Sequence, residues 1–169
     1  MHSDQGDLAF QHYFVREGCG PKVSGFSFDG IANAKLNPLI REWLADCDGV
    51  IICPSNPFVS VDPLLHLDGF GEALKSLPVI AVSPIVGGIA IKGPAAKMMH
   101  ELNMPATALA VADHYQGLID GFVVDQTDAA LVEQFNVPTI STPSVMVTLQ
   151  DRIDLARTCV SFLASLSSN

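Results

Sequence analysis

The chain of 169 residues is long enough for one domain that buries roughly two thirds of the surface its unfolded form exposes. Hydrophobic residues make up 49% of the chain and charged residues 16%, a composition that excludes a disordered protein. The formal net charge of -9 repels nucleic acids and anionic membranes at long range, so we expect neither as a partner.

Cysteine usage and the first residues predict a cytoplasmic location. The four cysteines have neither CxxC nor metal-finger spacing, so we expect small buried thiols, without a disulfide, in a reducing compartment. The N-terminal residues lack the basic and apolar regions of a signal peptide, and no apolar run approaches the roughly twenty residues of a membrane span. We therefore expect a cytoplasmic protein that does not bind membranes.

The N-terminal third is expected to hold a lead-in, a strand and a helix. Residues 7–18 (DLAFQHYFVREG) fit a helix or an extended lead-in, and residues 23–30 (VSGFSFDG) alternate as a strand does. Residues 36–48 (LNPLIREWLADCD) fit a helix whose apolar side chains face the core. These inward side chains are expected to be Leu39, Ile40, Trp43 and Leu44.

From residue 49 onward, short apolar runs alternate with helical segments. The strand candidates are residues 49–53, 78–83, 107–112, 121–125 and 137–141. Residues 94–103 and 128–136 are predicted helices, and residues 148–166 form an amphipathic helix that packs back onto the sheet. Such alternation predicts parallel strands with helices on both faces. We expect one α/β domain over residues 1–169, with an open, mainly parallel sheet in a Rossmann-like three-layer sandwich.

In an open parallel sheet, ligands bind beyond the carboxyl ends of the strands. The segments that follow the predicted strands are therefore the candidate site: PSNPFVS, PIVGG, DHYQG and QTD. They contain most of the serine, asparagine, glycine and histidine residues that could converge on one edge of the sheet.

The PSNP segment predicts a rigid turn from which Ser55 and Asn56 project. Such a turn can recognise the edge of a base or ring. An ordinary Asx turn is the alternative, and the motif by itself favours it. Asp62 opens the segment DPLLHL before Pro63, a position that predicts helix capping rather than metal binding.

The stretch SPIVGGIAIKGPAAKMM predicts a phosphate-binding loop. Gly87 and Gly88 let the backbone approach an anion, and GPAAKMM begins a helix whose free amides favour negative charge. Lys92 and Lys97 lie on either side of that helix start. The pattern is neither a Walker loop nor GxGxxG, and a tight glycine turn with two solvated lysines is the alternative.

His114 and Tyr115 follow a predicted strand, where a neutral imidazole could orient a hydroxyl or a phosphate oxygen. A structural histidine is the alternative. The sequence contains no HExxH or histidine–cysteine cluster for a metal, and no GxSxG for a serine hydrolase.

The segments CPSNPFVSV, PVIAVSPIVGG, KGPAAKMM, VADHY and DGFVVDQTDAAL, together with the N-terminal DLAFQHYFVR, resemble the 2-phospho-L-lactate transferase family. The similarity covers essentially the whole chain. It implies a magnesium-dependent transfer of a phospholactyl or phosphoenolpyruvyl group from a guanosine-diphospho-linked donor to 7,8-didemethyl-8-hydroxy-5-deazariboflavin, with release of GMP. This reaction belongs to the biosynthesis of the deazaflavin coenzyme F-420. It needs no covalent enzyme intermediate, so the protein would act by positioning and charge stabilisation.

The resemblance also implies a set of substrate-binding residues, whereas it assigns no catalytic or metal-binding residue here. The set is Ser55, Asn56, Pro57, Ser60, Ser83, Pro84, Gly87, Gly88, Lys92, Gly93, Pro94, Lys97, His114 and Tyr115. The glycine pair and the two lysines would hold phosphate oxygens, and Ser55, Asn56, His114 and Tyr115 would line the substrate cleft.

This sequence departs from the family in length. The family's chains are nearly twice as long, and the part without a counterpart is an N-terminal half with a glycine-rich nucleotide loop and an acidic metal-binding residue. We expect a C-terminal fragment that is inactive by itself, with Mg bound mainly by the missing half. Asp62 also stands where the family more often has glycine. An exposed sheet edge and exposed apolar helix faces predict a homo-oligomer, expected to be a dimer.

Two functions of other classes remain open. A non-catalytic regulator that binds nucleotide sugars shares this fold, although such proteins usually lack the paired SPIVGG and KGPxxKMM segments. A degenerate interaction domain would bind no ligand and would keep its dimer when Lys92 and Lys97 are replaced.

Overall fold

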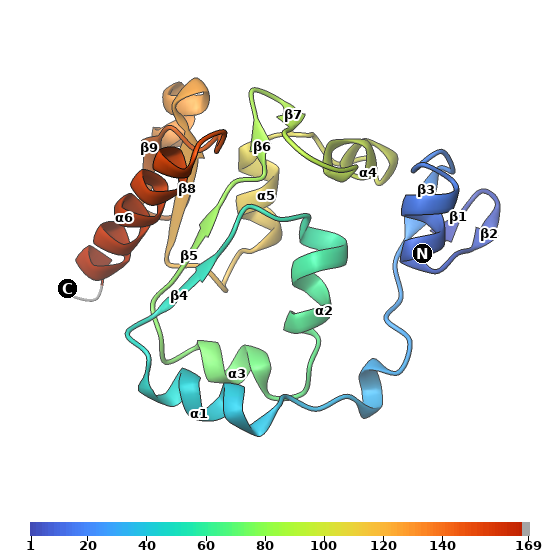
Figure 1. Cartoon of the computed structure of the whole chain (residues 1–169), viewed down its shortest axis with the longest axis horizontal. Helices are drawn as coiled ribbons and strands as arrows, with labels where there is room; N and C mark the ends of the chain where they lie inside the picture. The colour runs from blue at the N-terminus through green and yellow to red at the C-terminus, as the bar shows by residue number, and fades with distance from the viewer. Residues whose placement is uncertain (167–169) are drawn as a thin grey trace.

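A parallel four-stranded sheet lies at the centre of the protein, of which the computed structural model describes residues 1–166. Its strands are β4 (Val50–Ile52), β5 (Val79–Val82), β8 (Gly121–Asp125) and β9 (Thr139–Thr142), in the order β4-β5-β8-β9 (Figure 1). Ile51 pairs with Ile80, Ala81 with Phe122 and Val123 with Ile140. The predicted α/β fold with a parallel sheet is confirmed.

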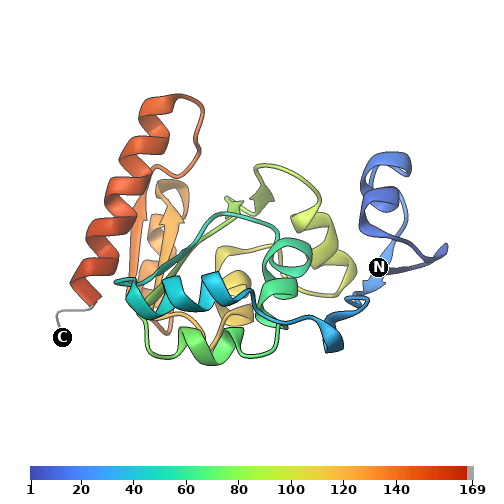
Figure 2. The same ribbon diagram turned by 60° about the horizontal axis from the view of Figure 1, so that its bottom comes forward.

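The sheet is covered on both faces, and alternate strand residues point to each cover. Ile80, Val82 and Val123 pack against the C-terminal helix α6 (Leu149–Leu166). Val79, Ala81, Phe122 and Val124 pack against the other side, which includes α4 (Ala95–Glu101) and α5 (Ala108–His114). Figure 2 shows α6 on one side of the strands and α4 and α5 on the other. Because β5 and β8 have cover on both faces and strands on both sides, every residue in them is buried.

The predicted strand over residues 107–112 is wrong, because this segment is helix α5. The Thr107 side chain accepts a hydrogen bond from the Ala110 amide and so caps the helix start. Three alanines follow Thr107 within the helix, and alanine is the best helix former. A six-residue apolar run fits a buried strand and a buried helix equally well, so the pattern was ambiguous. His114 is therefore the last residue of a helix and Tyr115 its C-cap, so neither follows a strand.

The N-terminal residues form a small antiparallel sheet at the far side of the molecule from α6 (Figure 1). Its strands are β1 (His2–Ser3), β2 (Gly6–Asp7) and β3 (Val23–Gly25), and the π-helical turn η1 (His12–Arg16) lies between β2 and β3. Only the first three residues of the predicted strand over residues 23–30 are a strand. Tyr13, which is fully buried, fixes η1 to the main core.

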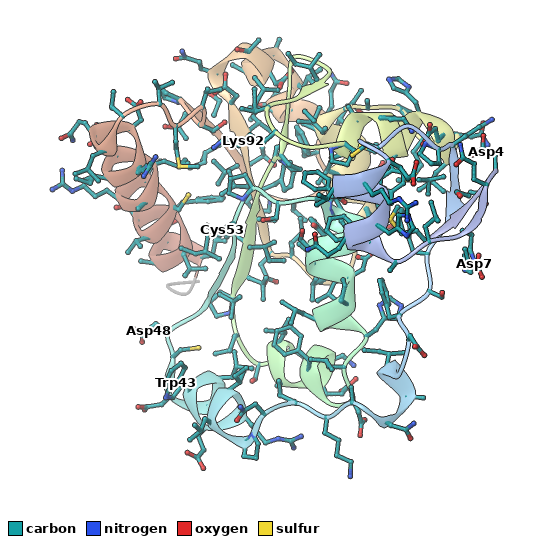
Figure 3. All side chains as sticks on the ribbon, turned by 45° about the vertical axis from the view of Figure 1, so that its right-hand side comes forward. Asp4, Asp7, Trp43, Asp48, Cys53 and Lys92 are labelled. Atoms are coloured by element: carbon teal, nitrogen blue, oxygen red, sulfur yellow. The ribbon has the colours of Figure 1, made fainter. Side chains whose placement is uncertain are left out.

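Helix α1 (Pro38–Asp46) occupies the predicted place, with the Asn37 side chain capping it. The predicted inward orientation of its apolar residues is wrong for most of them. Leu39 is 59% exposed, Ile40 38% and Trp43 73%, whereas Leu44 is partly buried against the core. Within residues 1–166, α1 contacts mainly α3 (Phe70–Leu74), which leaves its apolar stripe uncovered. Figure 3 shows Trp43 and Asp48 on the outside of the molecule.

The remaining elements are short. They are η2 (Ile31–Asn33), η3 (Pro57–Val61), α2 (Asp62–Leu65), β6 (Ile85–Val86), β7 (Ile89–Ala90) and η4 (Gln126–Gln134). The segment predicted as a helix over residues 128–136 is the 3-10 helix η4. No helix among the described residues is both long and apolar enough to cross a membrane. All four cysteines are free, but only Cys159 is buried and Cys53 is exposed, so the prediction of buried thiols holds for one of them.

Candidate functional site

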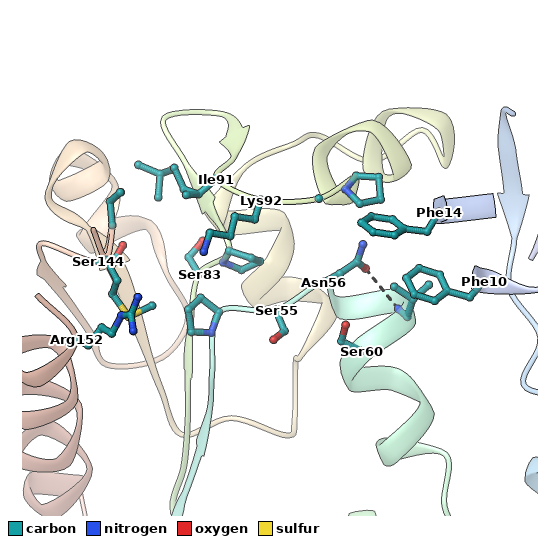
Figure 4. Close-up of a pocket in the computed structure, with 18 residues that line it drawn as sticks. Phe10, Phe14, Ser55, Asn56, Ser60, Ser83, Ile91, Lys92, Ser144 and Arg152 are labelled. Atoms are coloured by element: carbon teal, nitrogen blue, oxygen red, sulfur yellow. Dashed lines mark hydrogen bonds between the residues drawn. The ribbon is translucent and has the colours of Figure 1, made fainter. Parts of the chain in front are cut away.

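A cavity of about 590 Å³ lies beyond the carboxyl ends of β4 and β5 (Figure 4). The segments after β4, β5, β7 and β9 contribute to it, together with η1 and the start of α6. Its size is in the range of small-molecule sites, and its place is the one expected for an open parallel sheet. This is the concavity that the sequence predicts at the ends of the first two strands.

The structure gathers many of the predicted site residues around this cavity. Those that line it are Ser55, Asn56, Ser60, Ser83, Pro84, Lys92, Gly93 and Pro94. Those that do not line it are Pro57, Gly87, Gly88, Lys97, His114 and Tyr115. The ligand-binding roles of both groups stay predictions, and the geometry indicates what each residue is placed to do.

Asn56 shapes the turn after β4. Its Oδ1 accepts hydrogen bonds from the amides of Phe58 (3.0 Å) and Val59 (3.4 Å), and its Nδ2 lies 3.2 Å from the Met98 sulfur. The carboxamide thus caps η3, which is the Asx-type role that the motif by itself favours. The adjacent Pro57 is buried. The turn holds Ser55 and Ser60 at the cavity.

The serine hydroxyls around the cavity fall into two kinds. Ser83 Oγ donates to the Ile85 carbonyl (2.8 Å), and Ser144 Oγ donates to Asp125 (3.1 Å), so both protons are used inside the protein. Within residues 1–166, the hydroxyls of Ser55 and Ser60 make no hydrogen bond to other protein groups. These two are therefore the hydroxyl donors that a ligand can use.

Asp125, at the end of β8, fixes the Ser144 side of the cavity. It is only 4% exposed and accepts hydrogen bonds from the amides and hydroxyls of Thr127 and Ser144. Burial disfavours its charge, but these four hydrogen bonds outweigh the burial and hold the pKa of the Asp125 carboxyl below its usual value. All of its contacts are internal, so Asp125 is a positioning residue.

Lys92 and Arg152 are the cations of the cavity. Neither forms an ion pair within residues 1–166, and no aspartate, glutamate or histidine lines the cavity. Acidic residues outnumber basic ones by eighteen to nine in the whole chain, so a cavity with two free cations and no carboxylate is a distinct electropositive site. It is suited to a phosphate or carboxylate group.

Phe10 and Phe14 form the wall across the cavity from Arg152 (Figure 4). Their ring centroids lie 5.6 Å apart, and the ring planes are inclined by 23°. Sequence reasoning missed these rings, Ser144 and Arg152, because none of them directly follows one of the strands used to locate the site. Their signal was a pair of aromatic residues at i and i+4, and an arginine in the first turn of the last helix.

The Gly87–Gly88 pair forms the loop of the β6–β7 hairpin. Both glycines have positive φ values, 56° and 79°, as a two-residue hairpin loop of type I′ requires. The Gly87 amide donates to the Asp128 carboxylate at 3.0 Å. This amide is already satisfied by an anion of the protein itself, and the pair lies outside the cavity, so the alternative of a tight turn describes the glycines.

Lys97 joins α4 to η1 and to the loop before β3. Its ammonium group pairs with Glu101 and donates to the Pro21 carbonyl (2.8 Å) and to the Tyr13 hydroxyl (3.4 Å). Glu101 also accepts the Val23 amide at 3.0 Å. Burial disfavours the lysine charge, but the hydrogen bonds to Glu101 and Tyr13 outweigh this effect and raise the pKa of Lys97. These contacts support a structural role.

His114 and Asp62 form a second polar pair away from the cavity. His114 Nε2 lies 2.8 Å from Asp62 Oδ1, and the imidazole packs edge-on against Phe58. Tyr115 is 2% exposed, and its burial, with a smaller contribution from Asp62, raises the pKa of its hydroxyl. The prediction that Asp62 caps a helix is wrong, because its carboxylate binds His114 and makes no capping hydrogen bond.

The described residues do not fit a magnesium site. Among residues 1–166, no three histidine, cysteine, aspartate or glutamate side chains lie close enough together to hold a metal ion. The cavity offers cations and hydroxyls, whereas Mg²⁺ prefers carboxylate oxygens.

The fold and the cavity together define an α/β protein with an electropositive cavity at the carboxyl edge of a parallel sheet. Comparison with known proteins gives the family. The family model described as 2-phospho-L-lactate transferase CofD matches residues 1–152, so the chain belongs to the CofD family.

Three relatives agree with this assignment. The 2-phospho-L-lactate transferase of Methanococcoides burtonii is 34% identical over 98% of this chain and 55% of its own length. That of Methanocaldococcus jannaschii is 32% identical over 94% of this chain and 51% of its own length. That of Methanosarcina barkeri is 38% identical over 77% of this chain and 42% of its own length. The chain spans about half the length of the curated relatives it matches.

Proposed function

We propose that this chain forms the substrate-binding part of a 2-phospho-L-lactate transferase. The reaction transfers a phospholactyl or phosphoenolpyruvyl group from a guanosine-diphospho-linked donor to 7,8-didemethyl-8-hydroxy-5-deazariboflavin and releases GMP, in coenzyme F-420 biosynthesis. The observation that carries the proposal is the cavity with two free cations and no carboxylate, in a member of the CofD family. Such a site supports a substrate that is rich in phosphate.

The cavity residues act by positioning and by charge. Lys92 and Arg152 offset the negative charge of the phosphoryl group that is transferred, and the Ser55 and Ser60 hydroxyls donate to uncharged oxygens of the acceptor. No histidine or carboxylate in the cavity could accept the proton of the attacking hydroxyl. We therefore assign binding and orientation, but no proton transfer, to this chain.

We place the magnesium ligands in the part of the relatives' length that this chain does not span. No step is assigned to the ion here, since the described residues form no site for it. When bound, magnesium would neutralise phosphate charge on the donor. It follows that the chain by itself binds substrate and shows no turnover.

A dimer is also part of the proposal. β4 pairs only with β5 among residues 1–166, so its other edge is open, and the exposed apolar stripe of α1 precedes it directly in the chain. Open edges and apolar stripes of this kind favour association.

A binding protein without catalysis is the second candidate function. The cavity's lack of a proton acceptor favours it, because a regulator that only binds a nucleotide sugar needs none. This candidate requires affinity for a uridine-diphospho-sugar and none for a deazaflavin.

Titration of the chain with the deazaflavin acceptor, followed by acceptor fluorescence, decides between the two functions. We expect saturable binding of the deazaflavin. Lys92→Ala should weaken this binding once GMP, the product released from the donor, is present, because a cation is lost from the phosphate site. Tight binding of a uridine-diphospho-sugar, without binding of the deazaflavin, would favour the regulator instead.

A further inference from the structure

The groups that a ligand can use are sorted into two halves of the cavity (Figure 4). The first half contains the Phe10 and Phe14 rings with the free Ser60 hydroxyl, and Ser55 lies toward the middle. The second half contains Lys92 and Arg152, with Ser144 beside them. Neither half has a carboxylate.

The first half is built to hold a flat ring. The stacked phenyl rings present an apolar wall, and planar heterocycles bind to such aromatic walls by stacking. Tyr13, between them in the sequence, is fully buried and its hydroxyl accepts from Lys97. The wall is thus held in place by the core, not only by the rings themselves.

The second half is built to hold an anion and little else. The hydroxyl protons of Ser83 and Ser144 are directed into the protein, so the remaining side-chain donors on this side are the two cations. The Arg152 guanidinium can donate two parallel hydrogen bonds to one phosphate or carboxylate. Lys92, on the segment after β7, approaches the same space from another element.

We propose that the cavity fixes one ligand orientation, with a fused planar ring on Phe10 and Phe14, a hydroxylated chain along Ser55 and Ser60, and an anionic group on Lys92 and Arg152. This inference rests on the proposed function, in which the ring is that of the acceptor and the anion is the phosphate attached to it. It adds that the chain holds the phosphorylated compound more tightly than the unphosphorylated acceptor. The affinity for the phosphorylated product therefore comes from this chain, through Lys92 and Arg152.

Riboflavin and flavin mononucleotide test the orientation, since they share the ring and the hydroxylated chain and differ only in the terminal phosphate. Their fluorescence is titrated with the 169-residue chain at low and high salt. We expect the mononucleotide to bind about 10-fold to 100-fold more tightly, as one or two charged hydrogen bonds allow. High salt should reduce this difference, because it screens an exposed arginine.

Two substitutions separate the halves. Arg152→Gln should bring the affinity for the mononucleotide close to that for riboflavin and leave riboflavin binding unchanged. Phe14→Ala should weaken the binding of both flavins by the same factor, on the order of 10-fold, because a stacking surface is lost. The matched controls are Arg157→Gln on the same helix, where the side chain is 75% exposed, and Trp43→Ala on α1. Both controls should bind as the unchanged protein does, and thermal unfolding verifies the fold of all four variants.

Three results would overturn the orientation. The first is equal affinity for the two flavins. The second is an equal loss of affinity for riboflavin and flavin mononucleotide in Arg152→Gln. The third is no binding of either flavin. The deazaflavin titration described above is independent of these. Deazaflavin binding with any of the three results would leave the proposed function standing and remove only the orientation.

Discussion

Lys97 shows how a charged residue in a predicted phosphate loop can serve the fold instead. Its charge is matched by Glu101, which is 15% exposed in its side chain, and its hydrogen bonds reach Tyr13 in η1 and the Pro21 carbonyl before β3. Lys97→Met should therefore lower the free energy of unfolding by about 1–2 kcal/mol, a value reduced because the lysine is 36% exposed. Urea unfolding measures this change.

Lys75→Met is the matched control for Lys97. Lys75 pairs with Glu72 on the surface, where both side chains are at least 70% exposed. The control should change stability by no more than about 0.5 kcal/mol. Unchanged stability in Lys97→Met, together with loss of guanosine diphosphate binding, would return Lys97 to the phosphate site.

Asp125 predicts a pH dependence of stability. Hydrogen bonds hold the pKa of the Asp125 carboxyl below the ordinary value of about 3.9. The ionised carboxylate is therefore more stable in the folded protein than in the unfolded chain. This stabilisation is fully present above that ordinary value and is lost as the pH falls through the lower pKa of the folded state. Asp125→Asn should be less stable at pH 7, and its deficit should shrink in acid.

Urea unfolding between pH 3 and pH 7, with Asp154→Asn as an exposed control, measures this effect. The control should follow the unchanged protein at every pH, since Asp154 is 59% exposed in its side chain. A deficit of Asp125→Asn that stays constant down to pH 3 would show that the charge of Asp125 does not contribute.

The β6–β7 hairpin predicts a purely conformational effect of a glycine substitution. A Cβ atom at Gly88 would meet only the Ala106 carbonyl oxygen, at 3.8 Å, so space is not the constraint. Its φ of 79° is the constraint, and Gly88→Ala should cost about 1 kcal/mol of stability. Ligand binding should not change, because the turn lies outside the cavity.

Gly71→Ala is a comparison substitution that should change stability in the opposite direction. Gly71 lies in helix α3, and a Cβ atom there would meet nothing within 4 Å. This substitution should stabilise the protein by about 0.5–1 kcal/mol. Weaker phosphate binding by Gly88→Ala, with stability unchanged, would favour the phosphate-loop interpretation of the glycines.

The elements that the sequence predicts well are those with a single physical interpretation. The apolar sequence segments that form β5 and β8 end at turn residues and are rich in β-branched side chains, which favour buried strands. The run that forms α5 has a similar length and is also apolar, but its alanines and the Thr107 cap favour a helix. Whether such a segment becomes a helix or a strand depends on competition between local capping and pairing in the sheet. Hydrophobic periodicity does not show which of the two is favoured.

The same limit applies to the site. Ser55, Ser60 and Ser83 could be predicted as lining residues because they follow β4 and β5, whose ends share one edge of the sheet. Lys92 was predicted from its place before the start of a helix. Phe14 and Arg152 could not be predicted, because tertiary packing brings η1 and α6 to that edge.

At the scale of the whole molecule, the uncovered side of the protein predicts association. Trp43 on α1 is 73% exposed, and β4 has a free edge among the described residues. Sedimentation equilibrium should show the mass of two chains at high concentration, and Trp43→Glu should shift the protein toward the monomer. Val15→Glu is the control, since Val15 is 71% exposed on η1, distant from α1 (Figure 1). A monomer at every concentration would contradict the proposed dimer.

The central claim is that the cavity at the carboxyl ends of β4 and β5 is the substrate site. The most direct measurement is an NMR titration of the isotopically labelled chain with the deazaflavin acceptor, in which ligand-induced shifts of backbone amides are mapped. The largest shifts are expected at Phe14, Ser55 and Gly93, around the cavity. Shifts concentrated at Gly88, Lys97 and His114, with the cavity amides unmoved, would contradict it.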